Sequence, residues 1–167
     1  ALPILEDLGQ GGASPAALGG PGDRPAQAAE HGHRHRHAHR RVQGRELVVG
    51  DPANPANDIG PVIDQAAYDK LMAYRSTQKA RWLHCVDAPV QGQFVPPTII
   101  ELANVAELDA EWFGPVLHVA TWKAGELTAT INAVNAKGYG LTMGLHSRIA
   151  RTADEVEALG KVGNLYV

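Results

Sequence analysis

The stretch EWFGPVLHV, residues Glu111–Val119, decides how this 167-residue chain is interpreted. A carboxylate at a loop end, here Glu111, can accept two hydrogen bonds from the hydroxyls of a ribose. An aromatic side chain two residues later, here Phe113, can pack against the flat ring of a ligand. Gly114-Pro115 then predicts a tight turn into a strand. The same residues are also compatible with a surface glutamate, a core phenylalanine and an ordinary turn.

Outward from this stretch, strand-like and helix-like runs alternate with short links. Asp64 stands where a helix N-cap is expected, and Gly138 and Gly160 stand where two later helices end. The expected helices cover residues 65–79, 126–136 and 153–159, and the expected strands cover 81–86, 98–102, 115–122, 141–147 and 164–167. This alternation predicts an α/β fold with a parallel-type sheet flanked by helices.

The composition excludes several classes of protein. The formal net charge is −3, from 15 Lys and Arg against 18 Asp and Glu, so a strongly basic nucleic-acid binder is not expected. The chain contains no apolar run of about 18 residues, which excludes a transmembrane helix. Its single cysteine, Cys85, excludes an internal disulfide and any zinc site with two thiolates. Because the chain starts at Ala1 and stops inside its last expected strand, we expect a fragment.

Residues 1–46 differ from the rest of the chain. They contain none of the nine aromatic residues but hold eight Gly, eight Ala and five of the eight His. This composition offers little with which to build a core, and we expect the segment to be disordered. The tract His31–Arg41 could share a metal ion through alternate histidines, could bind phosphate or RNA, or could be a solvated tail. Its interleaved arginines oppose cation binding, so we predict no metal site.

Six motifs together resemble the aldehyde dehydrogenase superfamily. Glu111–Val119 is similar to the Glu-x-Phe-Gly-Pro motif of that family, and the other five occur in the family's order. They are Val49–Pro52, Asp58–Ile63, Phe94–Leu102, Gly138–Arg148 and Gly163–Val167. The resemblance covers about residues 46–167. His118 and the Gly-Leu-His-Ser-Arg stretch fit best the pyrroline-5-carboxylate dehydrogenase branch of the bifunctional proline-utilisation proteins. Residues 47–167 would then be part of a catalytic domain.

The resemblance implies a function for the full enzyme. That enzyme would oxidise glutamate semialdehyde to glutamate with NAD in proline catabolism, through a cysteine nucleophile. By the same resemblance, Glu111 would hold the hydroxyls of the nicotinamide ribose and Phe113 would flank the nicotinamide; Trp112 receives no role. We expect an oligomeric, cytoplasmic parent enzyme with an aldehyde as substrate, and no nucleic-acid partner.

Several parts of the family's machinery are missing. The nucleophile should precede Gly50-Asp51-Pro52 by about 35 residues, yet residues 1–84 contain no cysteine. The general-base glutamate and the dinucleotide-binding fold are absent as well. Residues before 46 could be translated out of frame, since a one-base shift from His31 permits Thr-Asp-Ile-Ala-Thr-Ala-Met-Leu, which resembles the family helix expected there. Cys85 lies in an expected strand, and we predict a structural role for it.

Two predictions follow for this chain as it stands. We expect no dehydrogenase activity, and we expect poor solubility because half a domain leaves sheet edges and apolar faces uncovered. The alternative is a non-catalytic aldehyde-dehydrogenase-like module that binds or scaffolds a partner. Retention of Glu111 and Phe113 argues against that alternative, because a scaffold does not require a ribose-binding carboxylate.

Overall fold

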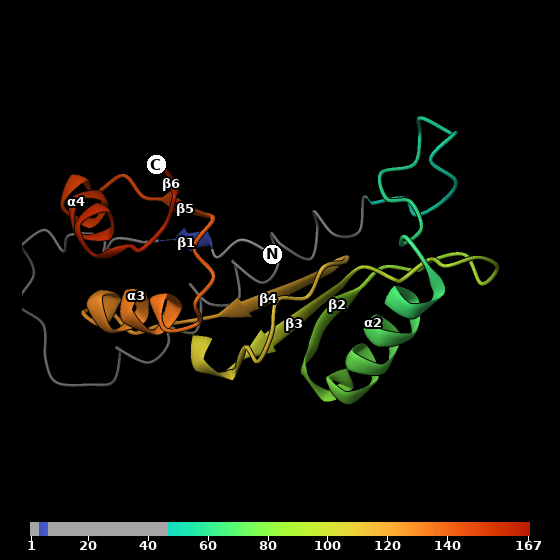
Figure 1. Cartoon of the computed structure of the whole chain (residues 1–167), viewed down its shortest axis with the longest axis horizontal. Helices are drawn as coiled ribbons and strands as arrows, with labels where there is room; N and C mark the ends of the chain where they lie inside the picture. The colour runs from blue at the N-terminus through green and yellow to red at the C-terminus, as the bar shows by residue number, and fades with distance from the viewer. Residues whose placement is uncertain (1–3, 7–46) are drawn as a thin grey trace, which may run out of the picture. The chain divides into compact units, whose positions relative to one another are not determined.

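A computed structural model describes residues 4–6 and 47–167 of the chain (Figure 1). The described residues divide into two compact units, one formed by residues 4–6, 102–111 and 120–167 and the other by residues 47–101 and 112–119. Both units combine strands with helices, which confirms the expected α/β class. In the part of the chain that the structure describes, no helix is both long enough and apolar enough to cross a membrane.

The unit with residues 47–101 and 112–119 is built around the sheet β2-β3-β4. Its strands are β2 (Trp82–Cys85), β3 (Thr98–Leu102) and β4 (Val116–Ala120), with the last residues of β3 and β4 assigned to the other unit. Helix α2 (Gln65–Thr77) packs on one face of this sheet, and a short 3-10 helix, η1 (Lys79–Arg81), leads from it into β2 (Figure 1). The expected strand 98–102 is confirmed to the residue.

Helix α2 begins where the sequence predicts. The carboxylate of Asp64 accepts a hydrogen bond from the Ala67 N–H at 2.7 Å, which satisfies one of the free N–H groups of the first turn. The buried face of the helix carries Leu71 and Arg75. This face meets the sheet directly, because the Arg75 guanidinium donates to Thr98 Oγ1 of β3 at 2.6 Å.

One strand pairing departs from the parallel pattern expected from the sequence. β2 and β3 are antiparallel, with Cys85 opposite Thr98 and an irregularity between Trp82 and His84. Within residues 86–97, which join the two strands, the structure contains no helix. A parallel pair usually needs a helical crossover, whereas antiparallel strands can be joined by a loop. The proline-containing connection therefore turns the chain back beside β2.

The unit with residues 120–167 contains the sheet β1-β5-β6, in which both pairings are parallel. Its strands are β1 (Ile4–Glu6), β5 (Thr142–His146) and β6 (Asn164–Tyr166), and its helices are η2 (Val105–Glu107), α3 (Leu127–Asn135) and α4 (Ala150–Leu159). The buried core gathers residues from α3, α4 and β5, namely Ile131, Val134, Met143, Leu145 and Val156. The succession α3-β5-α4-β6 is the parallel α/β arrangement that the sequence predicts.

Two details of this unit differ from the expectation. Helix α4 begins at Ala150 rather than Ala153, after Ser147 Oγ has accepted a hydrogen bond from the Ile149 N–H. β1 lies in a segment for which we expected no strand, and it pairs with β5. The remaining residues before Leu47, with the histidine tract and the proposed frame shift, lie outside the described residues.

Candidate functional site

The segment Glu111–Pro115 leads into β4 and contains the boundary between the two units, which falls between Glu111 and Trp112. The surroundings of Glu111 therefore belong to one unit and those of Phe113 to the other.

The backbone of Glu111 is hydrogen-bonded to Tyr139. Its N–H donates a hydrogen bond to the hydroxyl of Tyr139 at 3.1 Å. Tyr139 follows Gly138 in the turn after α3. The φ of Gly138 is +74°, in the left-handed region that favours glycine. The side chain of Glu111 is exposed, so its carboxylate is accessible to a ligand.

Phe113 is 79% exposed. A phenylalanine that contributed to the core would be largely buried, so the alternative of a core phenylalanine is wrong. Its ring is accessible to a flat partner, as a role beside a cofactor requires. The sequence prediction for Phe113 is compatible with this placement.

Trp112, to which the sequence analysis assigned no role, is held against helix α2. Its ring stacks on that of Tyr74, with centroids 3.7 Å apart and planes 16° from parallel. The ammonium group of Lys70, one helical turn before Tyr74, lies 5.2 Å from the centre of the Trp112 ring. The stack buries one face of each ring, and the cation–π contact attracts Lys70 to the indole, so both hold Trp112 against α2. The signal available in the sequence was the spacing of Lys70 and Tyr74, which places them on one helix face.

Gly114 lies directly against the same helix. A Cβ atom added at this position would lie 2.5 Å from Leu71 Cδ1, and Leu71 is only 2% exposed. On the sheet side, the Pro115 carbonyl accepts a hydrogen bond from the Thr98 N–H at 2.9 Å. The turn into β4 is thus packed against α2 and bonded to β3, and the close approach of Leu71 explains why position 114 is a glycine.

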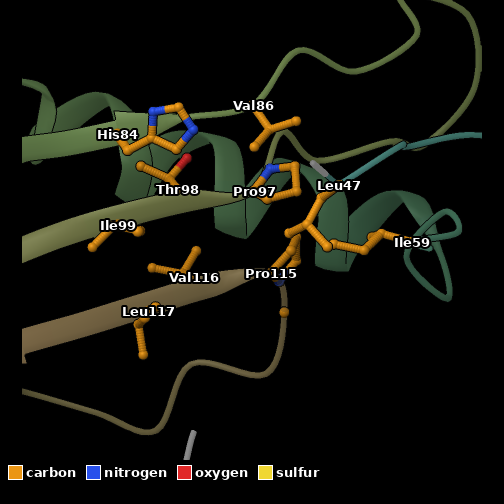
Figure 2. Close-up of a pocket in the computed structure, with 11 residues that line it drawn as sticks. Leu47, Ile59, His84, Val86, Pro97, Thr98, Ile99, Pro115, Val116 and Leu117 are labelled. Atoms are coloured by element: carbon orange, nitrogen blue, oxygen red, sulfur yellow. The ribbon is translucent and has the colours of Figure 1, made fainter. Parts of the chain in front are cut away.

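A pocket of about 390 Å³ lies on the sheet and the loops beside it, and Figure 2 shows the residues that line it. The residues that line it are mostly apolar and include Leu47, Ile59, Ile99, Pro115 and Leu117. His84 is the one titratable side chain in the lining, and its Nε2 is buried without a hydrogen-bond partner among the described residues. Neither Glu111 nor Phe113 lines this pocket, and it contains no pair of groups suited to acid–base chemistry.

Cys85 is half-buried in β2. Its Sγ lies 3.2 Å from Arg75 Nη2 and 3.7 Å from Thr98 Oγ1. The neighbouring His84 side chain lines the pocket described above, and its Nε2 makes no hydrogen bond to Cys85. Without an imidazole bonded to it among the described residues, Cys85 has no general base beside it, in keeping with the prediction that it does not replace the missing nucleophile.

Within residues 4–6 and 47–167, no group of three His, Cys, Asp or Glu side chains is placed to hold a metal ion. The tract His31–Arg41 lies outside these ranges, so its metal, anion and tail interpretations stay predictions.

The family model described as "Aldehyde dehydrogenase family" matches residues 36–167. The chain belongs to the aldehyde dehydrogenase family. The match begins about ten residues before the boundary at residue 46 that the sequence motifs suggest. It includes the segment Glu111–Pro115 and both proposed cofactor-binding residues.

Individual members of the aldehyde dehydrogenase family agree with the predicted branch. The bifunctional protein PutA of Salmonella typhimurium is 42% identical over 132 residues, which are 73% of this chain and 10% of that protein. The 1-pyrroline-5-carboxylate dehydrogenase of Bacillus cytotoxicus is 36% identical over 129 residues, which are 73% of this chain and 24% of that protein. A crystal structure of proline utilization A from Bradyrhizobium japonicum, 40% identical, superimposes with a TM-score of 0.71 over 74% of this chain and 13% of that one. This chain thus spans about a tenth of the PutA relatives that it matches.

Proposed function

We propose that this chain is part of a 1-pyrroline-5-carboxylate dehydrogenase module of proline catabolism. Its similarity to PutA and to 1-pyrroline-5-carboxylate dehydrogenases, and the retained Glu-x-Phe-Gly-Pro motif, support this assignment. In the parent enzyme the substrate would be the aldehyde form of pyrroline-5-carboxylate and the cofactor NAD. An oligomeric, cytoplasmic parent enzyme is part of the same proposal.

Within this module, Glu111 and Phe113 would hold the nicotinamide end of NAD. The single observation that carries this assignment is the 79% exposure of Phe113 beside a glycine and a tryptophan that are packed on α2. An exposed ring on a packed segment fits a planar ligand, since burying an aromatic face against another ring is favourable. The exposed carboxylate of Glu111 fits a ribose, because its two oxygens can each accept a hydrogen bond from one of two adjacent hydroxyls.

The two residues would have distinct tasks. NAD, when bound, supplies the acceptor for a hydride ion. Glu111 would fix the ribose through two charge-assisted hydrogen bonds, and Phe113 would cover one face of the neighbouring ring and exclude water from it. Neither residue would transfer a proton or form a covalent bond.

We further propose that the chain has no dehydrogenase activity by itself. Acyl transfer in this family needs an activated thiolate. The only cysteine of the sequence, Cys85, lies in β2, and no imidazole is bonded to it among the described residues. Following NADH absorbance with pyrroline-5-carboxylate and NAD tests this directly, and turnover above a blank without protein would refute it.

The cofactor assignment is tested by titrating the chain with NAD in a calorimeter. Because the dinucleotide-binding fold is absent, we expect weak but saturable binding through the nicotinamide end of NAD. This binding should weaken about ten-fold in Glu111→Ala, since the variant loses charge-assisted hydrogen bonds. The matched control is Glu157→Ala, which removes an exposed carboxylate from α4. For Phe113→Ala the control is Leu141→Ala, because Leu141 is an apolar residue of almost equal exposure, 80%.

The outcomes separate the two functions considered. Binding that weakens in both site variants and in neither control supports the dehydrogenase module. NAD binding that is absent, or equal in all four variants, would overturn the assignment and favour the non-catalytic module.

A further inference from the structure

We propose that Trp112 is a positioning residue that presents Phe113 to the cofactor, through its stack on Tyr74 and its contact with Lys70 of helix α2. This inference rests on the proposed role of Phe113. It concerns a side chain that occupies the unspecified position of the Glu-x-Phe-Gly-Pro motif in this chain.

One face of α2 contacts the residues on both sides of Phe113. Lys70 and Tyr74 are four residues apart, so their side chains share one face of the helix. Both reach the same indole, Tyr74 by a stack with a centroid distance of 3.7 Å and Lys70 with its ammonium 5.2 Å from the ring centre. Leu71, between them in sequence, contacts Gly114. One turn of α2 therefore holds the residues on both sides of Phe113.

Tyr74 is itself held in place by a hydrogen bond to the sheet. Its hydroxyl shares a hydrogen bond of 2.7 Å with Nε2 of His118, which lies in β4. The tyrosine ring is thus attached to α2 through its backbone and to the sheet through its hydroxyl. A ring held at both ends is a rigid base for the indole of Trp112.

The ring of Phe113 is kept away from α2 by its two neighbours. Trp112 and Gly114 both contact α2, while Phe113 between them is 79% exposed. The neighbours on both sides of Phe113 are therefore held by the helix, while the ring between them faces solvent. An exposed aromatic ring would otherwise gain free energy by folding back on nearby apolar surface. With Trp112 and Gly114 held on α2, the Phe113 ring stays directed away from the helix.

A double-mutant cycle on NAD affinity tests the inference, because a residue that acts through Phe113 must lose its effect when Phe113 is gone. In the chain with Phe113 present, we expect Trp112→Leu to raise the Kd for NAD about five-fold. In the Phe113→Ala background, we expect the same substitution to change the Kd by less than about two-fold. Trp112→Phe, which keeps a ring for the stack, should restore most of the affinity.

Controls separate positioning from loss of folding. Trp122→Leu removes a half-buried tryptophan from the core of the other unit, and we expect it to lower the urea midpoint but leave the NAD Kd of the folded chain unchanged. Tyr74→Phe keeps the stacking ring and removes the bond to His118, and we expect a Kd between those of the wild type and Trp112→Leu.

Each result decides one proposal. If Phe113→Ala leaves the Kd unchanged, or if the wild-type chain shows no saturable binding, the proposed function fails and the positioning role fails with it. If Phe113→Ala weakens binding but Trp112→Leu does not, or if the two effects multiply independently, only the positioning role is refuted.

Discussion

Substituting Gly114 with alanine adds one methyl group between the turn before β4 and helix α2. The new Cβ would lie 2.5, 3.0 and 3.3 Å from three side-chain atoms of Leu71. Contacts below 3.0 Å require a shift, and Leu71 is 2% exposed, so its side chain has no free solvent into which to move. The φ of Gly114 is not positive, and the cost therefore comes from overlap rather than from backbone strain.

The expected loss of stability for Gly114→Ala is about 1–3 kcal/mol, the usual cost of forcing a further methyl group into a packed core. Gly144→Ala is the matched control, because a Cβ at that position meets no atom within 4 Å. We expect this control to be neutral or to stabilise by about 0.5 kcal/mol through the loss of chain entropy in the unfolded state. Urea titrations followed by tryptophan fluorescence report both changes as shifts of the midpoint.

A double-mutant cycle identifies the contact responsible. Leu71→Ala alone should cost about 2–5 kcal/mol by leaving a cavity. In the double variant the added methyl group occupies part of that cavity, so the summed single losses should exceed the double loss by more than about 1 kcal/mol. Equal stability of Gly114→Ala and Gly144→Ala, or additive losses at positions 71 and 114, would contradict an overlap between the added methyl group and Leu71.

Further predictions concern the supports around this segment. Asp64→Ala removes the side-chain cap of α2 and should cost about 1 kcal/mol, whereas Asp64→Ser should keep most of it, as measured by urea midpoint. Arg75→Ala removes a side chain that is 3% exposed, together with its hydrogen bond to Thr98, and should lower the free energy of unfolding by about 2–4 kcal/mol in thermal or urea unfolding. The control Arg151→Ala, at an exposed position, should change it by no more than about 0.5 kcal/mol. Equal losses would contradict a stabilising role for the buried arginine. Tyr139→Phe deletes the acceptor for the N–H of Glu111 and should weaken NAD binding about three-fold with little change in stability; an unchanged Kd would show that this bond does not hold Glu111.

Local signals in the sequence determined much of the element types and several of their ends. Asp64 begins α2 because a cap acts on N–H groups only two or three residues away. Gly138 ends the α3 loop because its left-handed backbone is a property of that residue alone. The strand Thr98–Leu102 was predicted to the residue, and in the structure its buried and half-buried positions alternate with the period of a strand. The family motif, including Glu111 and Phe113, was likewise legible without any contact, because its residues are consecutive.

Only the tertiary structure decided which distant segments meet. The antiparallel pairing of β2 with β3 and the pairing of β1 with β5 depend on chain returns that no local pattern encodes. Trp112 was given no role from the sequence, and it acquired one because Tyr74 and Lys70, about forty residues earlier, are brought against its ring. Capping and backbone conformation are short-range and additive along the chain, whereas stacking and strand pairing are interactions between partners that folding alone brings together.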